Sequence, residues 1–525
     1  MDIPGKDNYS DKKSFLISLI IWVVVIKIII FLLDPTVMFF IDDSSRYIDT
    51  AISSYIPPDR SFLYGFLIRW LTYFSQSLTT LILFQVLCSA TSAVLAGYIL
   101  NRFLSINMAV ARVFAVLCAN APIQLMYERY VLTETISLLF FVIFITTAFC
   151  YLQKPRIRTL ITVNLSGVIL IAFRLSYLPV VLSGAVIVPF LAFFSIPPGR
   201  DSDIAEDRWN GKPGIKKRVI VSCLHIVLSC LLTYGLHSAY KIINGRLSDK
   251  PPAYQYCDGY HLIASWAPLL EKEDFADPRL EGYNKQYFYI ILKDRFQRMN
   301  QRWSYYGITN YIHHMDDSRV KTNKIAHDTA MHILYRDPFG IIKLAWQGYM
   351  DYWDMKLLKK NLLEDRCIRE FPNKLLEILK SNYHIYGEGL RFQKTLTNQY
   401  FLNAIPWYMV LFCLPLIIVI TIIMDKRRRL LFLIPLSLFA LLLMVNSTIL
   451  VHRNTMRFFH PDEWIVILFL GVLIDRILKK DFVRAAGRNL QGIYKKLIFR
   501  ISSIVDMQGQ SNISSALKVL IRRKN

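Results

Sequence analysis

Residues 400–451 read YFLNAIPWYMVLFCLPLIIVITIIMDKRRRLLFLIPLSLFALLLMVNSTILV and contain two long uncharged runs separated by DKRRR. The runs cover 400–424 and 430–451, and a helix needs about 20 apolar residues to cross the hydrocarbon core of a bilayer. Each run is therefore long enough to span a membrane once. The basic break between them is typical of a turn that stays in the cytoplasm. This stretch predicts two transmembrane helices joined by a cytoplasmic turn.

The composition of the whole chain also indicates a membrane protein. The chain has 525 residues, of which 54% are hydrophobic and 19% charged, and its mean hydropathy is +0.34. These values exclude an intrinsically disordered chain, a disulfide-rich mini-protein and an ordinary soluble enzyme. The net charge of +23 comes mainly from basic residues beside the apolar runs. That pattern favours contact with membrane lipids and argues against nucleic-acid binding.

Ten apolar segments predict helical crossings. They are 14–33, 78–100, 103–123, 131–152, 157–173, 175–196, 219–240, 400–424, 430–451 and 460–478. With ten crossings both termini are cytoplasmic, because the basic residues then fall in the inner loops and few remain in the outer hairpins. The sequence thus predicts an all-α polytopic membrane protein with about ten transmembrane helices.

The long loops divide this architecture into four parts. We expect a transmembrane module over 1–240, an extracytoplasmic domain over 241–398, further transmembrane helices over 399–478 and a basic amphipathic tail over 479–525. Apolar residues in the extracytoplasmic part recur at spacings of three and four, so this domain is predicted to be mainly helical.

Two further features of the outer segments bear on the compartment. Cys257 and Cys367 both lie in 241–398, and whether they form a disulfide stays open. The same segment contains no Asn-x-Ser/Thr sequon, which disfavours a glycosylated lumenal domain and favours a bacterial inner membrane. Within the first outer loop, 34–77, the stretch 62–74 is too short to span and is expected to lie in the membrane interface.

Acidic residues near the outer ends of the spans are candidate functional groups, because a charge near the bilayer core is costly without a partner or a role. The candidates in the first outer loop and the second outer hairpin are Asp42, Asp43, Tyr47, Glu128, Arg129 and Glu134. Glu134 opens an apolar helix, so its carboxylate has to face a polar cavity or a cation.

Basic residues gather in the later outer turns. These candidates are Arg174, His452, Arg453 and Arg457. In a compact bundle the early acids and the later bases would converge on one pocket. Such a pocket suits a negatively charged leaving group held by Arg and His, and a nucleophile whose proton is removed by a carboxylate.

On these residues the chain resembles the C-type (GT-C) superfamily of integral-membrane glycosyltransferases, which includes protein O-mannosyltransferases and the bacterial aminoarabinose transferase of lipid A. Asp43, Tyr47 and Ala51 are similar to the family's acidic motif in the first outer loop, with Ser44 where Glu is commoner. The other matching positions are Glu134, Gly167, Arg174, Pro179, Arg457, Phe458 and Pro461.

The resemblance implies an inverting transfer of a sugar from a polyprenyl phosphate to a lipid, glycan or protein acceptor outside the membrane. Asp43 or Asp42 would be the general base, assisted by Glu134. The lipid phosphate would bind to Arg174, His452, Arg453 and Arg457. Tyr47, Glu128 and Arg129 would contact the rest of the substrate. Asp43 and Glu134 together would suit a divalent cation, Mg²⁺, Mn²⁺ or Ca²⁺, if one is required.

Two other functions stay open at this point. One is an O-antigen ligase or polymerase, although such enzymes rely chiefly on Arg and His rather than on acids. The other is a transporter or flippase of an anionic lipid or sugar, which would need charges along a path through the bilayer. Purely structural roles are also open: Asp42 and Asp43 as helix caps, Glu134 in an ion pair, and Arg174 as an interfacial anchor.

Overall fold

The fold is described from a computed structural model that covers residues 9–192, 215–283, 301, 304–366, 371–386, 395–425, 427–450 and 454–479. Within these ranges the chain is helical, and the β pairing consists of one isolated parallel bridge between Met38 and Tyr130. The chain divides into two compact units, Met1–Phe469 and Leu470–Asn525. The arrangement below is that of the first unit.

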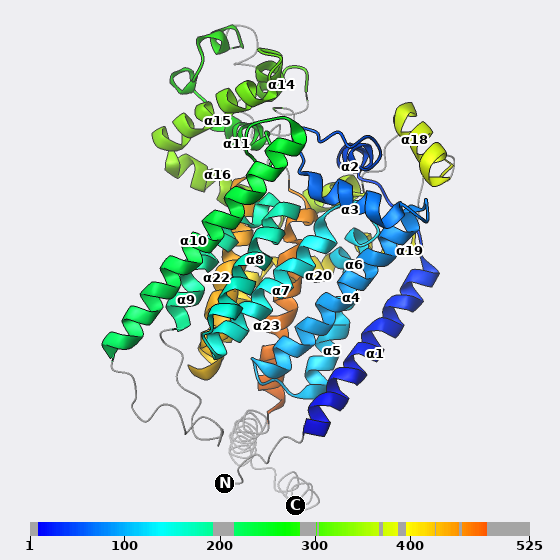
Figure 1. Ribbon diagram of the computed structural model, residues 1–525, viewed down its shortest axis with the longest axis vertical. Coiled ribbons are helices and arrows are strands. Elements are labelled where there is room, and N and C mark those ends of the chain that lie inside the picture. Colours follow the sequence, from blue (N-terminus) through cyan, green and yellow to red (C-terminus); the bar gives the residue numbers. More distant parts are fainter. Residues whose placement is uncertain are drawn as a thin grey trace, which may run out of the picture. The chain divides into compact units, whose positions relative to one another are not determined.

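Six helices among the described residues are long and apolar enough to cross a membrane. They are α1 (Tyr9–Leu33), α4 (Leu78–Arg102), α7 (Glu134–Gln153), α9 (Leu178–Ala192) with the preceding turn η1 (Leu175–Tyr177), α10 (Ile215–Ser248) and α22 (Arg427–Ile449). They run side by side in Figure 1. Two shorter helices, α20 (Ile405–Phe412) and α21 (Leu414–Met424), meet at an angle of 58° and would add a seventh crossing if they form one bent span.

The six or seven candidate spans among the described residues do not confirm the ten crossings that hydropathy predicts, while the all-helical class agrees. The segment 103–123 forms α5 (Met108–Ala119), which stops at Asn120, and the separate α6 (Pro122–Tyr127). The segment 157–173 forms α8 (Ile157–Phe173), whose 17 residues extend only about 25 Å at 1.5 Å per residue. The segment 460–478 forms α23 (His460–Leu478), which carries two acidic residues in its first turn.

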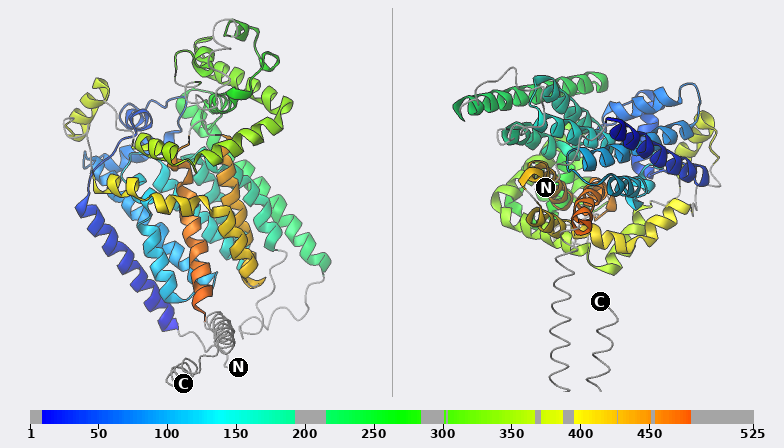
Figure 2. Two further views of the ribbon diagram at one scale, coloured as in Figure 1. Left: turned by 180° about the vertical axis from the view of Figure 1, so that it is seen from behind. Right: turned by 90° about the horizontal axis from the view of Figure 1, so that it is seen from below.

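The remaining helices gather at one end of the apolar bundle, which we call the capped end (Figures 1 and 2). The first loop contributes α2 (Ile41–Ser53) and α3 (Phe62–Thr72). The later segments contribute α11 (Asp258–Trp266), α14 (Ile308–His313), α15 (Arg319–Arg336), α16 (Pro338–Asp351), α17 (Met355–Asp365), α18 (Asn373–Tyr383) and α19 (Leu396–Asn403). A separate apolar cluster joins α11, α14 and α15, and it includes Ile263, Trp266 and Ile333.

Small residues allow the apolar helices to approach closely. A Cβ atom on Gly167 of α8 would lie 2.7 Å from Val181, and one on Gly184 of α9 would lie 2.7 Å from Phe144. Val181 of α9 and Phe144 of α7 therefore fill the space that the two glycines leave. This is the packing by which helices associate in lipid, where burial of apolar surface supplies little drive.

Candidate functional site

The first loop and the hairpin between α6 and α7 are joined by backbone hydrogen bonds. Met38 N–H donates to the carbonyl of Arg129 at 2.8 Å, and Val131 N–H donates back to Met38 at 3.0 Å. Ser44, the departure from the family's acidic pair, is fully buried; its hydroxyl donates to the Val131 carbonyl at 3.0 Å and accepts from Phe40 N–H at 2.9 Å. This pairing fixes α2 against the start of α7.

The pairing brings two predicted acids to one guanidinium group. Arg457, on the short 3₁₀ turn η7 (Met456–Phe459), donates from Nη1 to Asp43 Oδ2 at 2.5 Å and from Nε to Glu134 Oε1. Arg60 donates to the other oxygen of Asp43. The Asp43 side chain is 16% exposed, whereas Glu134 is fully buried. Asp43 thus lies where solvent or a ligand reaches the cluster.

Arg174 forms a second ion pair with Glu134. It lies at the break between α8 and η1, its Nη1 is 3.5 Å from Glu134 Oε1, and its Nη2 donates to the Arg457 carbonyl at 3.2 Å. Its guanidinium also lies 5.2 Å from the ring centroid of Phe458. Among the described residues, Glu134 Oε2 has no hydrogen-bond partner.

A second layer of charge supports Asp43 from the loop between α2 and α3. Asp59 forms ion pairs with Arg46 and with Arg60, the latter at 3.4 Å. Burial raises the pKa of Asp59, but the two guanidinium groups outweigh it and hold the pKa below its ordinary value. Among the described residues the cluster contains four guanidinium groups (Arg46, Arg60, Arg174 and Arg457) and three carboxylates (Asp43, Asp59 and Glu134). These groups have one more positive than negative charge, which favours an anion.

Two groups in this cluster, Tyr47 and Arg457, keep their protons near neutral pH. Burial raises the pKa of Tyr47 to about 12, so its hydroxyl stays protonated near neutral pH. Burial disfavours the charge of Arg457, yet Glu134 and Asp43 raise its pKa well above the ordinary value. Of these groups only a carboxylate can accept a proton, and Asp43, unlike Glu134, is partly exposed.

The turn that carries Arg457 is held by a residue that the sequence did not single out. Asp365, fully buried at the end of α17, accepts from the Thr455 hydroxyl at 2.6 Å and from Met456 N–H at 2.7 Å. The Tyr352 hydroxyl accepts from Thr455 N–H at 3.1 Å. The position of Arg457 therefore depends on α17 as well as on the bundle.

The other predicted site residues lie elsewhere or outside the described residues. Glu128 and Arg129 are fully buried beside α1, where Lys27 donates to Glu128 at 2.6 Å. The structure places Asp42 in α2 but does not describe its side chain. His452 and Arg453 fall in the undescribed segment 451–453, and Cys367 in 367–370, so the disulfide with Cys257 stays a prediction.

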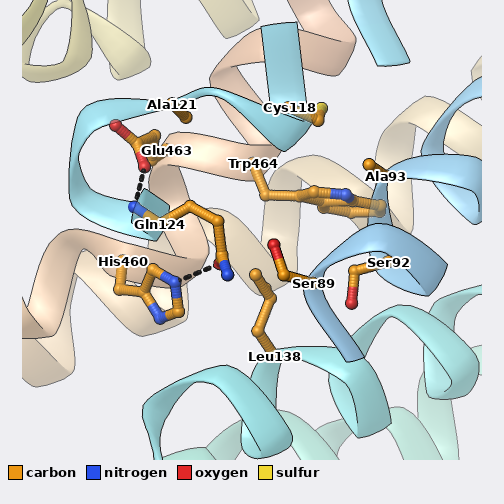
Figure 3. A pocket seen from close by; sticks show the side chains of 10 residues that line it. All are labelled: Ser89, Ser92, Ala93, Cys118, Ala121, Gln124, Leu138, His460, Glu463 and Trp464. Atoms are coloured by element: carbon orange, nitrogen blue, oxygen red, sulfur yellow. Dashed lines mark hydrogen bonds between the residues drawn. The ribbon is translucent and has the colours of Figure 1, made fainter. Parts of the chain in front are cut away.

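A small cavity lies between α4, α6 and α23 (Figure 3). Glu463 accepts from the N–H groups of Ile123 at 3.2 Å and Gln124 at 3.0 Å, and Gln124 in turn pairs with His460 at 2.5 Å. Glu463 therefore caps the first turn of α6. The cavity volume of about 10 Å³ holds roughly one water molecule and excludes a sugar.

The cluster does not fit a divalent cation in this arrangement. Hard cations take about six oxygen ligands, whereas both Asp43 oxygens and Glu134 Oε1 face guanidinium groups. Within the described part of the chain no three His, Cys, Asp or Glu side chains form a metal-binding group.

Sequence reasoning missed Arg60 and Asp365. The pair Asp59-Arg60 follows Pro57-Pro58, in a turn close in sequence to the acidic motif. This position could have indicated Arg60 as an ion-pair partner of Asp43. Asp365 offered no signal, since it contacts residues 90 and 91 positions away. Comparison of the chain with known protein families, curated proteins and solved structures finds no match.

Proposed function

We propose that this protein is a membrane glycosyltransferase that moves a sugar from a polyprenyl phosphate to an acceptor at the capped end, which we take as the extracytoplasmic side. The observation that carries the proposal is the joining of Asp43, Glu134, Arg174 and Arg457 at the ends of apolar helices. A base beside an excess of guanidinium groups suits displacement of a phosphate leaving group.

The proposed step assigns one role to each part of the cluster. Asp43 takes the proton of the acceptor O–H or N–H as the acceptor atom bonds to the anomeric carbon. The bond between that carbon and the phosphate oxygen breaks on the opposite face, and the polyprenyl phosphate leaves with the electron pair. Arg174, Arg457 and Arg60 bind the phosphate, and this exchange frees Asp43 from the two guanidinium groups that hold it in the unliganded protein.

A groove between α9 and α10 supports a lipid donor. Its volume is about 360 Å³, and the residues that line it include Leu182, Ala185, His237 and Lys241. Tyr240, next to Lys241, hydrogen-bonds Ser61, the neighbour of Arg60. We propose that the polyprenyl chain lies in this groove with its phosphate toward the cluster.

The test is turnover by purified protein in lipid nanodiscs supplied with short-chain polyprenyl phosphates that carry different sugars. Release of free polyprenyl phosphate is measured for the wild type, Asp43→Asn and Asp49→Asn. The matched control Asp49 lies on the same helix α2. We expect Asp43→Asn to lower turnover by about 10²- to 10⁴-fold while donor binding is kept, and Asp49→Asn to match the wild type.

Three outcomes would change this proposal. Turnover that survives in Asp43→Asn but is lost in Asp42→Asn would transfer the base to Asp42. Transport of the labelled lipid between leaflets without release of its phosphate in any variant would favour the flippase alternative, and chain extension of a lipid-linked glycan would favour the polymerase.

A further inference from the structure

Helix α16 carries an unusual apolar stripe on its outward face. Phe339 is 81% exposed and Trp346 is 61% exposed. On α16 the stripe consists of Phe339, Ile342, Trp346 and Met350, and their spacings of three and four place them on one side of the helix. Tyr335 at the end of α15 and Trp353 just after α16 are also exposed. The opposite side of α16 is buried through Ile341, Leu344 and Gly348.

The depth of α16 is set by its contacts with the apolar helices. The Gly348 carbonyl accepts from Asn454 at 2.9 Å, and Gly348 lies against Thr448 in the last turn of α22. Tyr349 donates to the Phe412 carbonyl at 2.6 Å, at the bend between α20 and α21. Figure 1 shows α16 beside the upper end of α22. The stripe therefore lies at the level where membrane-crossing helices end, which is where Trp and Tyr are enriched in membrane proteins.

Exposed lysines lie on the helix that follows the stripe in sequence. The next helix, α17, buries Leu358 and Leu362 and exposes Lys356, Lys359 and Lys360 on its other side. By contrast, α15 exposes Lys321, Lys324 and Asp328 in place of a continuous apolar stripe. An aromatic stripe joined to a lysine-rich face is the pattern of helices that lie in an anionic lipid surface.

We infer that α16 and α17 rest in the headgroup region of an anionic leaflet at the capped end. The stripe enters the boundary between headgroups and acyl chains, and the three lysines of α17 contact lipid phosphates. Because α17 also carries Asp365, which holds the turn of Arg457, this contact links the lipid surface to the position of the charged cluster. The inference stands whether or not the protein transfers a sugar.

The test uses the full chain in nanodiscs made of phosphatidylcholine and phosphatidylglycerol, with bromine placed on the acyl chains of one lipid or the other. Bromine quenches tryptophan fluorescence on contact. We expect Trp346→Phe to lose part of the quenchable signal, while the matched control Trp266→Phe, whose indole is 4% exposed, loses none. Equal losses in the two variants would overturn the inference.

Lipid charge is tested in the same nanodiscs at constant composition. We expect stronger quenching when the bromine is on phosphatidylglycerol, and loss of this difference when Lys356, Lys359 and Lys360 are all replaced by Gln. Replacing Lys321 and Lys324 of α15 by Gln is the control and should leave the difference intact. Equal quenching by both brominated lipids in the wild type would overturn the role of anionic lipid.

Discussion

Two clusters of charge arise from the same hairpin and differ in their access to solvent. Glu128 and Arg129 turn toward α1 and meet Lys27, and all three side chains are at most 1% exposed. Glu134, six residues after Glu128, meets Arg174 and Arg457, and Asp43 in that cluster is 16% exposed. Acids and bases in one hairpin therefore form a fully buried cluster on one side and a partly exposed one on the other.

The balance of charge separates the clusters further. The α1 cluster has two cations and one carboxylate, and three Arg129 nitrogens have no hydrogen-bond partner in the described residues. A cation is costly in that setting and is offset by Glu128 and by the Phe31 ring, 5.3 Å from the guanidinium. In the proposed function, by contrast, an anion that binds the Asp43 cluster replaces a carboxylate as partner of its guanidinium groups.

The largest expected effect is loss of stability on breaking the α1 cluster. Glu128→Gln removes the carboxylate that contacts both buried cations, Lys27 and Arg129, which costs about 3–5 kcal/mol. Unfolding of the purified protein in mixed micelles measures this change. Adding Lys27→Met should restore part of the stability, because it removes one of the uncompensated cations.

Measurements on Glu128→Gln also test whether the α1 cluster is purely structural. If Glu128→Gln keeps the wild-type unfolding curve but abolishes binding of the donor lipid, the α1 cluster belongs to the binding site. Glu128 and Arg129 would then contact substrate, as the family resemblance implies.

Hydropathy identified the long apolar helices but not how many of them cross a membrane. A helix inside the bundle and a helix in lipid are equally apolar, so composition alone does not determine whether the shorter apolar helices α5 and α8 cross. Charge at the ends of apolar runs indicated Asp43, Glu134, Arg174 and Arg457, which do meet. It indicated Glu128 equally, because a sequence does not show whether a hairpin side chain turns toward the bundle or toward solvent.

A smaller effect is expected at Asp365, which is buried like Glu128 yet adjoins the Asp43 cluster. Asp365→Asn weakens two hydrogen bonds to a carboxylate, at a cost of about 2 kcal/mol. Because η7 is then less firmly held, turnover should fall while the protein stays folded. Unfolding and turnover are measured together on one preparation. Wild-type turnover in a destabilised variant would show that the position of Arg457 does not depend on α17.

Arg174→Lys keeps the positive charge and removes the planar guanidinium, so it separates the effect of charge from that of guanidinium geometry. We expect donor affinity to fall about tenfold, or roughly 1.4 kcal/mol, because Lys cannot bind phosphate through two parallel hydrogen bonds. Titration with labelled polyprenyl phosphate measures the affinity. Arg279→Lys at the exposed pair with Asp277 is the matched control. Equal affinities in all three proteins would leave Arg174 with a structural role.

The smallest effect is expected at Asp59, whose partners Arg46 and Arg60 lie at the edge of the cluster. Asp59→Asn should lower stability at neutral pH by about 1 kcal/mol, the upper end for an ion pair near solvent. Because the pKa of Asp59 is held below its ordinary value of 3.8, its contribution is present above that pH and is lost as the pH falls through the folded-state pKa. The unfolding curves of wild type and variant should therefore converge in acid. A gap that persists there would mean that the substituted amide disturbs the loop itself, and the ion pairs would then contribute little to holding Arg60 against Asp43.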